Sequence, residues 1–568
     1  MSDTELRKPA ADRKVLVIGL DGATLGLIQP WAAEGYVPTL ASVMAGGVYG
    51  KLTSVIPPLT APAWSTFMTG MNPGKHGVFD FMRRDPGTYQ LRPVNGSARD
   101  GSSLWKTLTS HGKRSVVLNV PMTFPPEQIN GIIVSGMLTP HTHSDFTYPS
   151  EWSAYLHEIA GGYEIVPEGV LHPLGRESRY LEEVVRITQK RLKVCLELVK
   201  MVDWDFFMVV FQGTDHLQHA LWRYMDKTHS KYDAKAPESL QNAIGAIYQH
   251  MDRCLAEIIQ AVDEETLVVI MSDHGFGPLE NDIHVNTWLL EQGYMKLRRN
   301  PLVRAKVMGY RIGLTPINSY KLAQRLSRGR FAGRAMAKHK NESLALLRRL
   351  FLSFNDVDWE RSQAYSFGYL GPIYVNLKGR EPQGAVSPGR ECENLLEELS
   401  RRLLGMADAS TGERVIEKVY RREELYWGPH LEEAPDLIFI TRDMRHSACG
   451  DYEFPASSFL SPAFRASGGH RLDGILIMKG PHIKKGVELQ EANLADLLPT
   501  ILAYLNVPIP EEVDGKPLMK AFQDEFAQWL NVSYSSSKRA GEPSVETPFT
   551  LEDEKAIKDR LRGLGYIG

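Results

Sequence analysis

Two residues able to bind a metal follow an apolar segment in the middle of the chain. Residues 266–271 (Thr-Leu-Val-Val-Ile-Met) predict a buried strand, and Asp273 and His274 come directly after it. In open α/β sheets, ligands bind at the carboxyl ends of such strands, and carboxylate and imidazole groups suit a hard or borderline metal. An isolated Asp-His pair can equally be a hydrogen-bonded loop cap. The choice depends on partners elsewhere in the chain.

Two further apolar segments end in candidate partners. Asp21 follows residues 14–20, and Asp215 and His219 follow residues 206–211. If a helix begins near residue 214, the spacing of four places Asp215 and His219 on one face, as two ligands of one ion require. An aspartate at the end of a strand is often only a turn residue, so each segment alone is weak support.

His470 completes the set, in a Ser-Gly-Gly-His-Arg sequence just before the apolar residues 474–478. A single histidine is more often structural than a ligand. Together, however, the candidates amount to three aspartates and three histidines, which suffice for two metal ions with open positions for a substrate.

Thr60 is the candidate nucleophile for ester chemistry at such a centre. It lies among prolines, and the residues that follow predict a helix through Trp64 and Met68. The free N–H groups and the dipole at a helix N-terminus favour a phosphoryl group, and a bound metal would ionise the hydroxyl. The alternative is that Thr60 is only an N-cap.

The order and spacing of these residues resemble the alkaline phosphatase superfamily, and within it the type I phosphodiesterase/nucleotide pyrophosphatase family. The resemblance covers roughly residues 13–290 and 355–525. It rests on Asp21, Thr60 in Thr-Ala-Pro, Asp215 with His219, Asp273-His274 and His470, supported by the short motifs Pro38-Thr39-Leu40, Phe67-Met68-Thr69-Gly70 before Pro73, and His76-Gly77-Val78.

The resemblance implies a fold, a cofactor and a mechanism. The fold is an alkaline-phosphatase-like three-layer α/β/α core with a mostly parallel central sheet, interrupted by a helical insertion. The cofactor is a pair of divalent metal ions, usually zinc, although the mixed nitrogen and oxygen ligands would also accept manganese. The implied ligands are Asp21, Asp273, His274 and Thr60 for one ion, and Asp215, His219 and His470 for the other. Thr60 would attack phosphorus in line, forming a phosphothreonine-type intermediate that water then releases.

Departures from related enzymes narrow the substrate. Sulfatases carry Cys or Ser followed by x-Pro-x-Arg, whereas residues 60–64 read Thr-Ala-Pro-Ala-Trp, so sulfate esters are disfavoured. No arginine lies beside Thr60 to clamp the extra charge of a monoester. Trp64 could pack on a base or an alkyl group of a diester, or it could be an ordinary core aromatic. The phosphate-binding Asn of nucleotide pyrophosphatases has no clear match in residues 76–81, where Asp80 is the nearest polar candidate, so nucleotide specificity is not predicted.

Composition limits the partners and the compartment. The formal net charge of −3 argues against general attraction to nucleic acid. The four cysteines are scattered, which favours neither a disulfide framework nor a zinc ribbon. No apolar segment reaches the length of a signal sequence or a transmembrane helix, and we expect a cytoplasmic protein.

The chain divides into four predicted parts. We expect a catalytic core in residues 13–290 and 355–530, separated by a basic helical insertion, 291–354. A polar linker and peripheral helical tail follow in 531–568. Residues 296–349 hold fifteen Lys/Arg against one acidic residue, Glu342. This insertion could be a lid that attracts phosphate-rich substrates or an anionic surface, or a solvated face or oligomer contact.

Segments on either side of the basic insertion have predicted roles as well. Residues 138–180 could frame the substrate pocket with His141, His143 and His172. Beyond the insertion, 364–367, 373–377 and 436–440 predict strands of the resumed core.

The predicted function is a metal-dependent hydrolase of phosphodiester or pyrophosphate bonds that acts on a small phosphorylated substrate. A phosphotransferase or phosphonate hydrolase could use the same site, and a non-catalytic protein that binds a phosphorylated ligand is a weaker alternative. The sequence does not determine the oligomeric state.

Overall fold

The computed structural model describes residues 13–142, 145–167, 176–327, 350–536 and 549–564. His143, His172 and residues 328–349 of the basic segment lie outside these ranges, so the expectations for them are not tested.

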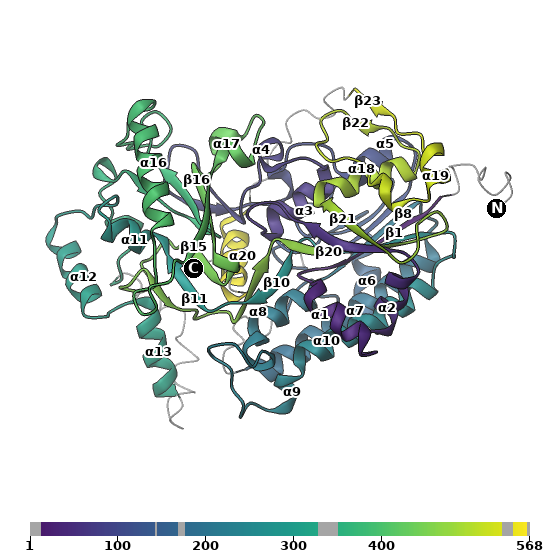
Figure 1. The fold of residues 1–568 in the computed structure, drawn as a ribbon, viewed down its shortest axis with the longest axis horizontal. Coiled ribbons are helices and arrows are strands. Elements are labelled where there is room, and N and C mark those ends of the chain that lie inside the picture. The colour runs from purple at the N-terminus through teal and green to yellow at the C-terminus, as the bar shows by residue number, and fades with distance from the viewer. Residues whose placement is uncertain (1–12, 143–144, 168–175, 328–349, 537–548, 565–568) are drawn as a thin grey trace.

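A nine-stranded, mostly parallel sheet forms the centre of the molecule (Figure 1). Three strands at its middle, β1 (Val15–Leu20), β8 (Phe206–Phe211) and β9 (Leu267–Met271), are buried along their whole length and pair in parallel. This is the arrangement that their continuous apolar sequences predict. In spatial order the strands are β21 (Val487–Asn493), β2 (Val48–Thr53), β20 (Asp473–Lys479), β9 (Leu267–Met271), β1 (Val15–Leu20), β8 (Phe206–Phe211), β5 (Ser115–Leu118), β6 (Gly131–Val134) and β7 (Thr147–Tyr148).

Helices cover both faces of this sheet and give the predicted three layers. Alternate residues of β1 point to opposite cores, with Val15 and Val17 on one side and Leu16 and Ile18 on the other. The first core is closed by α3 (Thr60–Thr69), α5 (Leu104–Ser110) and α18 (Leu497–Tyr504). The second core is closed by α1 (Leu25–Ala33), α2 (Pro38–Ala45), α6 (Trp152–Ala160), α7 (Glu177–Met201), α8 (Gly213–Met225) and α10 (Ala243–Gln260).

A third core lies beside the central sheet and is built on two small sheets. The segments predicted as resumed core strands fall here, in the sheet β12-β14-β16-β15, because their antiparallel partners are one another and not the central strands. The elements are β12 (Ala364–Tyr365), β14 (Pro372–Val375), β16 (Leu437–Thr441) and β15 (Ile416–Arg421), then β13 (Gly368–Tyr369), β17 (His446–Gly450), β11 (Asn281–His284) and β18 (Leu460–Pro462), with α11 (Val285–Glu291), α12 (Pro301–Arg311), α13 (Pro316–Ser327) and α16 (Arg390–Leu404).

The C-terminal helix α20 (Leu551–Leu564) is not peripheral, contrary to the expectation from its charged sequence. Ile557 and Leu561 are fully buried in the first core, and the guanidinium of Arg560 donates to the carbonyl of Pro140. Two apolar side chains four residues apart are enough to bury one face of a helix whose other faces are polar.

Trp64 is a core aromatic and does not face a substrate. Its ring is fully buried, packs edge-on against Phe67 and lies so close to β1 that a Cβ added at Gly19 would come within 2.8 Å of it. The reading of Trp64 as a platform for a base or an alkyl group is therefore wrong. The glycine of β1 and the indole together set the distance between α3 and the sheet.

Trp64→Ala should lower the free energy of unfolding by about 3–5 kcal/mol, because it leaves a large cavity between α3 and β1. The measurement is the urea midpoint followed by far-UV circular dichroism. Trp529, which is 60% exposed, is the matched control, and Trp529→Ala should change stability by less than about 0.5 kcal/mol. Equal effects of the two substitutions would contradict the packing role of Trp64.

Candidate metal centre and adjoining pocket

Asp21, Asp273 and His274 meet at the carboxyl edge of the central sheet. Since β1 and β9 are adjacent and parallel, the residues that follow them come together. Nε2 of His274 lies 3.5 Å from Oδ1 of Asp21 and 3.4 Å from Oδ2 of Asp273, and all three side chains are fully buried. We call these residues the first trio.

Asp215, His219 and His470 form a second trio beside the first. The helix α8 begins at Gly213, so Asp215 and His219 share one face as the spacing predicted. Oδ1 of Asp215 lies 3.4 Å from Nε2 of His219 and 3.4 Å from Nε2 of His470, and the two Nε2 atoms are 2.9 Å apart.

The pairing of β10 (Gly275–Pro278) with β19 (Gly468–Arg471), a strand much later in the sequence, brings His470 to the site. The strands are antiparallel and pair Phe276 with His470. The rings of His274 and His470 stack with their centroids 3.6 Å apart. The two trios are therefore one contiguous cluster, and Asp215, His274 and His470 also lie within 4.8 Å of one another.

Backbone carbonyls fix the orientation of all three imidazoles. The Nδ1 atoms of His274, His219 and His470 lie 3.1, 3.0 and 2.8 Å from the carbonyl oxygens of Gly275, Gly468 and Pro58 respectively. A carbonyl accepts only, so each Nδ1 carries the proton and each Nε2 turns a lone pair toward the aspartates. A metal-ligating histidine usually donates its other ring N–H to a carbonyl or carboxylate in this way, which fixes the tautomer and the direction of the ring.

The pKa shifts of the buried side chains indicate that the cluster lacks positive charge. Burial, together with the charges of Asp273 and Asp215, raises the pKa of Asp21 well above its ordinary value. Burial and then the Asp215 charge raise the pKa of Asp273 to about 8. Burial lowers the pKa of His274, so this imidazole does not supply the missing positive charge.

The residues therefore fit divalent metal ions. The Nε2 atoms of His219 and His470 face each other at 2.9 Å, and two such nitrogen atoms need a cation or a shared proton between them. The donor set is mixed imidazole nitrogen and carboxylate oxygen, which suits a borderline divalent cation.

Side chains around the first trio hold it in place, and the sequence did not single them out. Nε2 of Gln212 lies 3.4 Å from Oδ2 of Asp21, and the hydroxyl of Thr214 donates to the backbone carbonyl of Asp21. Gln218 donates to the carbonyl of Gly22 at 2.8 Å. Their positions beside Asp215 on α8 were the only sequence signal for this role.

Thr60 is the first residue of α3 and is fully buried. Its hydroxyl oxygen has no hydrogen-bond partner in the part of the chain that the structure describes. The link to the cluster runs through the backbone, because Pro58, two residues earlier, accepts the hydrogen bond of His470. None of the contacts recorded for the described residues joins Thr60 directly to the two trios.

Asp80 takes no part in this cluster. Its carboxylate accepts hydrogen bonds from the backbone N–H groups of Met82 at 3.2 Å and Tyr369 at 3.0 Å, and so connects the first part of the chain to β13. Burial raises its pKa to about 7. Asp80 is a structural tie between two cores and not a substitute for a phosphate-binding Asn.

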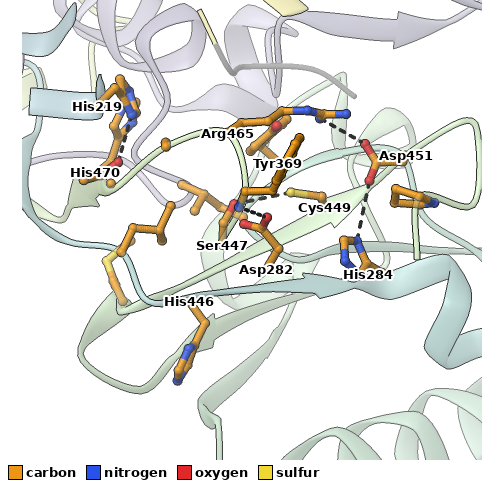
Figure 2. Close-up of a pocket in the computed structure, with 18 of the residues that line it drawn as sticks. His219, Asp282, His284, Tyr369, His446, Ser447, Cys449, Asp451, Arg465 and His470 are labelled. Atoms are coloured by element: carbon orange, nitrogen blue, oxygen red, sulfur yellow. Dashed lines mark hydrogen bonds and ion pairs between the residues drawn. The ribbon is translucent and has the colours of Figure 1, made fainter. Parts of the chain in front are cut away.

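A pocket opens beside the second trio (Figure 2). It encloses roughly 740 Å³, including its open mouth, and is lined by Leu59, His219 and His470 at the inner end. The rest of the wall comes from the third core and its loops. These residues are Leu279, Asp282, His284, Ile317, Tyr369, Leu370, Met444, His446, Ser447, Cys449, Asp451, Pro455, Phe464, Arg465, Ala466, Gly468 and Gly469.

The far wall of the pocket carries a polar chain (Figure 2). Nη1 of Arg465 lies 3.7 Å from Oδ1 of Asp451, whose other oxygen lies 3.9 Å from Nδ1 of His284. These residues carry no recognisable sequence motif, because they lie on β11 and on loops that only the third core brings together. His141, expected to frame the pocket, lies instead 3.6 Å from Asp553 of α20.

Comparisons with known proteins identify the family of this chain. The family model described as type I phosphodiesterase/nucleotide pyrophosphatase matches residues 15–453. No curated protein matches the chain significantly.

Two solved structures of phosphonoacetate hydrolase from Sinorhizobium meliloti 1021 are similar in fold. The complex with phosphonoformate is 13% identical and the complex with phosphonoacetate 12%. Both have a TM-score of 0.53, and each alignment covers 88% of this chain and 96% of the other. Human ectonucleotide pyrophosphatase/phosphodiesterase 5 is 13% identical over 87% of this chain and 95% of its own, with a TM-score of 0.44.

The first two likenesses confirm the alkaline-phosphatase-like fold, and the family model spans most of the chain. This protein therefore belongs to the type I phosphodiesterase/nucleotide pyrophosphatase family, a family of phosphohydrolases.

Proposed function

We propose that this protein cleaves phosphodiester or pyrophosphate bonds through a covalent intermediate on Thr60. Two divalent metal ions would be held by the first trio with Thr60 and by the second trio. The observation that carries the proposal is the common orientation of three imidazoles, each held at Nδ1 by a backbone carbonyl, toward three buried carboxylates. Such a set has little structural purpose without a cation.

Zinc suits the mixed nitrogen and oxygen donors, and manganese is the alternative. Bound there, the two cations would supply the charge that lowers the pKa of the Thr60 hydroxyl and of water and that stabilises the leaving oxygen.

The chain's own residues would act in two displacements. Thr60 Oγ forms a bond to phosphorus while the bond from phosphorus to the leaving oxygen breaks, the hydroxyl proton going to solvent. Water then attacks the phosphothreonine, the Oγ–P bond breaks and the hydroxyl is restored. The backbone N–H groups in the first turn of α3 would be available to donate to the phosphoryl oxygens that Thr60 would carry. Two inversions leave the configuration at phosphorus unchanged.

The surroundings of Thr60 favour a substrate with one negative charge on the reacting phosphate. Its neighbours Leu59, Ala61 and Ala63 are apolar and buried, and provide no guanidinium to clamp a monoester dianion. Arg465, the guanidinium of the pocket wall, lies 3.7 Å from the Asp451 carboxylate. We place the leaving group in the pocket, since His219 and His470 of the second trio line its inner end.

We also propose a cytoplasmic location. Support comes from the cysteines, since Cys195, Cys254, Cys392 and Cys449 are all free thiols and most are buried. Among the described residues, no helix has both the length and the apolar character needed to cross a membrane.

Thr60→Ala should reduce the turnover of an aryl phosphodiester by at least about 10³-fold, because the covalent step has no other nucleophile. Thr60→Ser should retain part of the activity. The control is Thr69→Ala, which removes a hydroxyl at the other end of α3, where it donates to the carbonyl of Ser65. Full diesterase activity in Thr60→Ala would exclude Thr60 as the nucleophile.

The purified protein should contain two divalent ions per chain by elemental analysis. Asp273→Asn and His219→Ala should each lose one of the two, since they belong to different trios. His446→Ala, a pocket histidine outside both trios, should keep both. A chelator should abolish turnover and lower the thermal unfolding midpoint, because it leaves three buried carboxylates uncompensated. A protein that binds no divalent ion would contradict the proposal.

A substrate panel tests the class of bond. We expect the highest kcat/KM for an aryl phosphodiester, lower values for an aryl phosphomonoester and for phosphonoacetate, and the lowest for an aryl sulfate. The ratios should be measured with the same metal-loaded preparation, so that metal content cancels. Preferred turnover of the monoester or the phosphonate would replace the diesterase assignment.

A further inference from the structure

An apolar stripe on α12 is turned to solvent. Pro301, Ala305, Met308 and Ile312 follow one another at intervals of four, three and four residues, which places them on one face of the helix. All four are exposed, Met308 to 71% and Ile312 to 87%. Helices of soluble proteins normally bury such a stripe against the core of the protein.

The stripe is not the consequence of a loosely attached helix. The opposite face of α12 buries Val303 and Tyr310 in the third core. Nζ of Lys306 lies 2.9 Å from the carboxylate of Asp356, and both side chains are largely buried. The helix is thus anchored by one apolar face and presents a second.

Basic residues border the stripe. Arg304 and Arg311, seven residues apart, lie along one side of it and are exposed. Residues 292–327 contain eight Lys/Arg and no Asp or Glu. A helical face that is only solvated normally mixes both signs of charge, so this composition points to an anionic partner.

The neighbouring helix continues the surface. Leu314 in the connection, and Tyr320 and Leu322 on α13, are exposed, as is Lys321 between them. Figure 1 shows α12 at the left edge of the molecule and α13 extending below it, away from the central sheet. On its inner side α13 contributes Ile317 to the pocket wall, so the surface and the pocket are adjacent.

We propose that α12 and α13 form a docking surface for an anionic lipid bilayer. Exposed Met, Ile and Leu would enter the boundary between headgroups and acyl chains, while the arginines and lysines contact lipid phosphates. An anionic membrane supplies both an apolar phase and a dense negative charge, and it is the partner that this combination fits. The inference does not depend on the proposed function, because it concerns binding and not turnover.

The test is flotation of the full-length protein with lipid vesicles. It should bind vesicles of phosphatidylcholine mixed with phosphatidylglycerol at least tenfold more tightly than vesicles of phosphatidylcholine alone, and high salt should weaken that binding. The double substitutions Met308→Asp with Ile312→Asp and Arg304→Glu with Arg311→Glu should each reduce the binding at least tenfold.

Met201→Asp is the matched control, since Met201 is 51% exposed at the end of α7, outside this surface. It should bind vesicles like the wild type. Turnover of a water-soluble aryl phosphodiester without vesicles should be unchanged in every variant, which shows that they are folded. Equal binding to neutral and anionic vesicles, or unchanged binding by the Met308/Ile312 variant, would overturn the proposal. So would a wild-type dimer in light scattering that the same variant converts to a monomer, because the surface would then join two copies of the chain.

Discussion

The mutual repulsion of buried carboxylates is the constraint on which the rest of the structure depends. Asp21, Asp215 and Asp273 lie together at one edge of the central sheet, all fully buried. Burial and like charge push the pKa of Asp21 and Asp273 upward. Three side chains of this kind destabilise a fold unless positive charge compensates them. The orientation of the histidines by backbone carbonyls and the hydrogen bonds from residues of α8 hold these carboxylates together in one cluster.

The third core adds structure around this charged edge that the central sheet does not provide. It returns the chain to the site through β19, so that His470 stacks on His274. It also builds the pocket wall from β11, β17 and the following loops. Asp80 joins the two cores through the backbone of Tyr369. The charged cluster and the wall of the pocket beside it are thus built by different parts of the fold.

Sequence patterns identified the features that local rules determine. The strands β1, β8 and β9 are continuous apolar segments, and the residues after them were recognisable because parallel strands end at one edge. The shared face of Asp215 and His219 follows from helical periodicity. The features that the sequence did not predict depend on tertiary contacts. A tryptophan in the core and one that contacts a substrate look alike in sequence. The strands between residues 364 and 441 likewise gave no sign in the sequence that they pair with one another. Arg465 and Asp451 were invisible for the same reason, because only tertiary contacts bring loop residues to a pocket.

The position of His470 has a consequence for how the protein is made. During synthesis the chain emerges from its N-terminus, so Asp21, Asp273 and His274 are all available while residue 470 is still to be added. At that stage Asp215 and His219 lack their partner His470. The carbonyl of Pro58 likewise lacks the His470 imidazole that it orients. The two halves of the charged cluster are therefore completed at different times, the first once residue 274 has been added and the second only once residue 470 has been added.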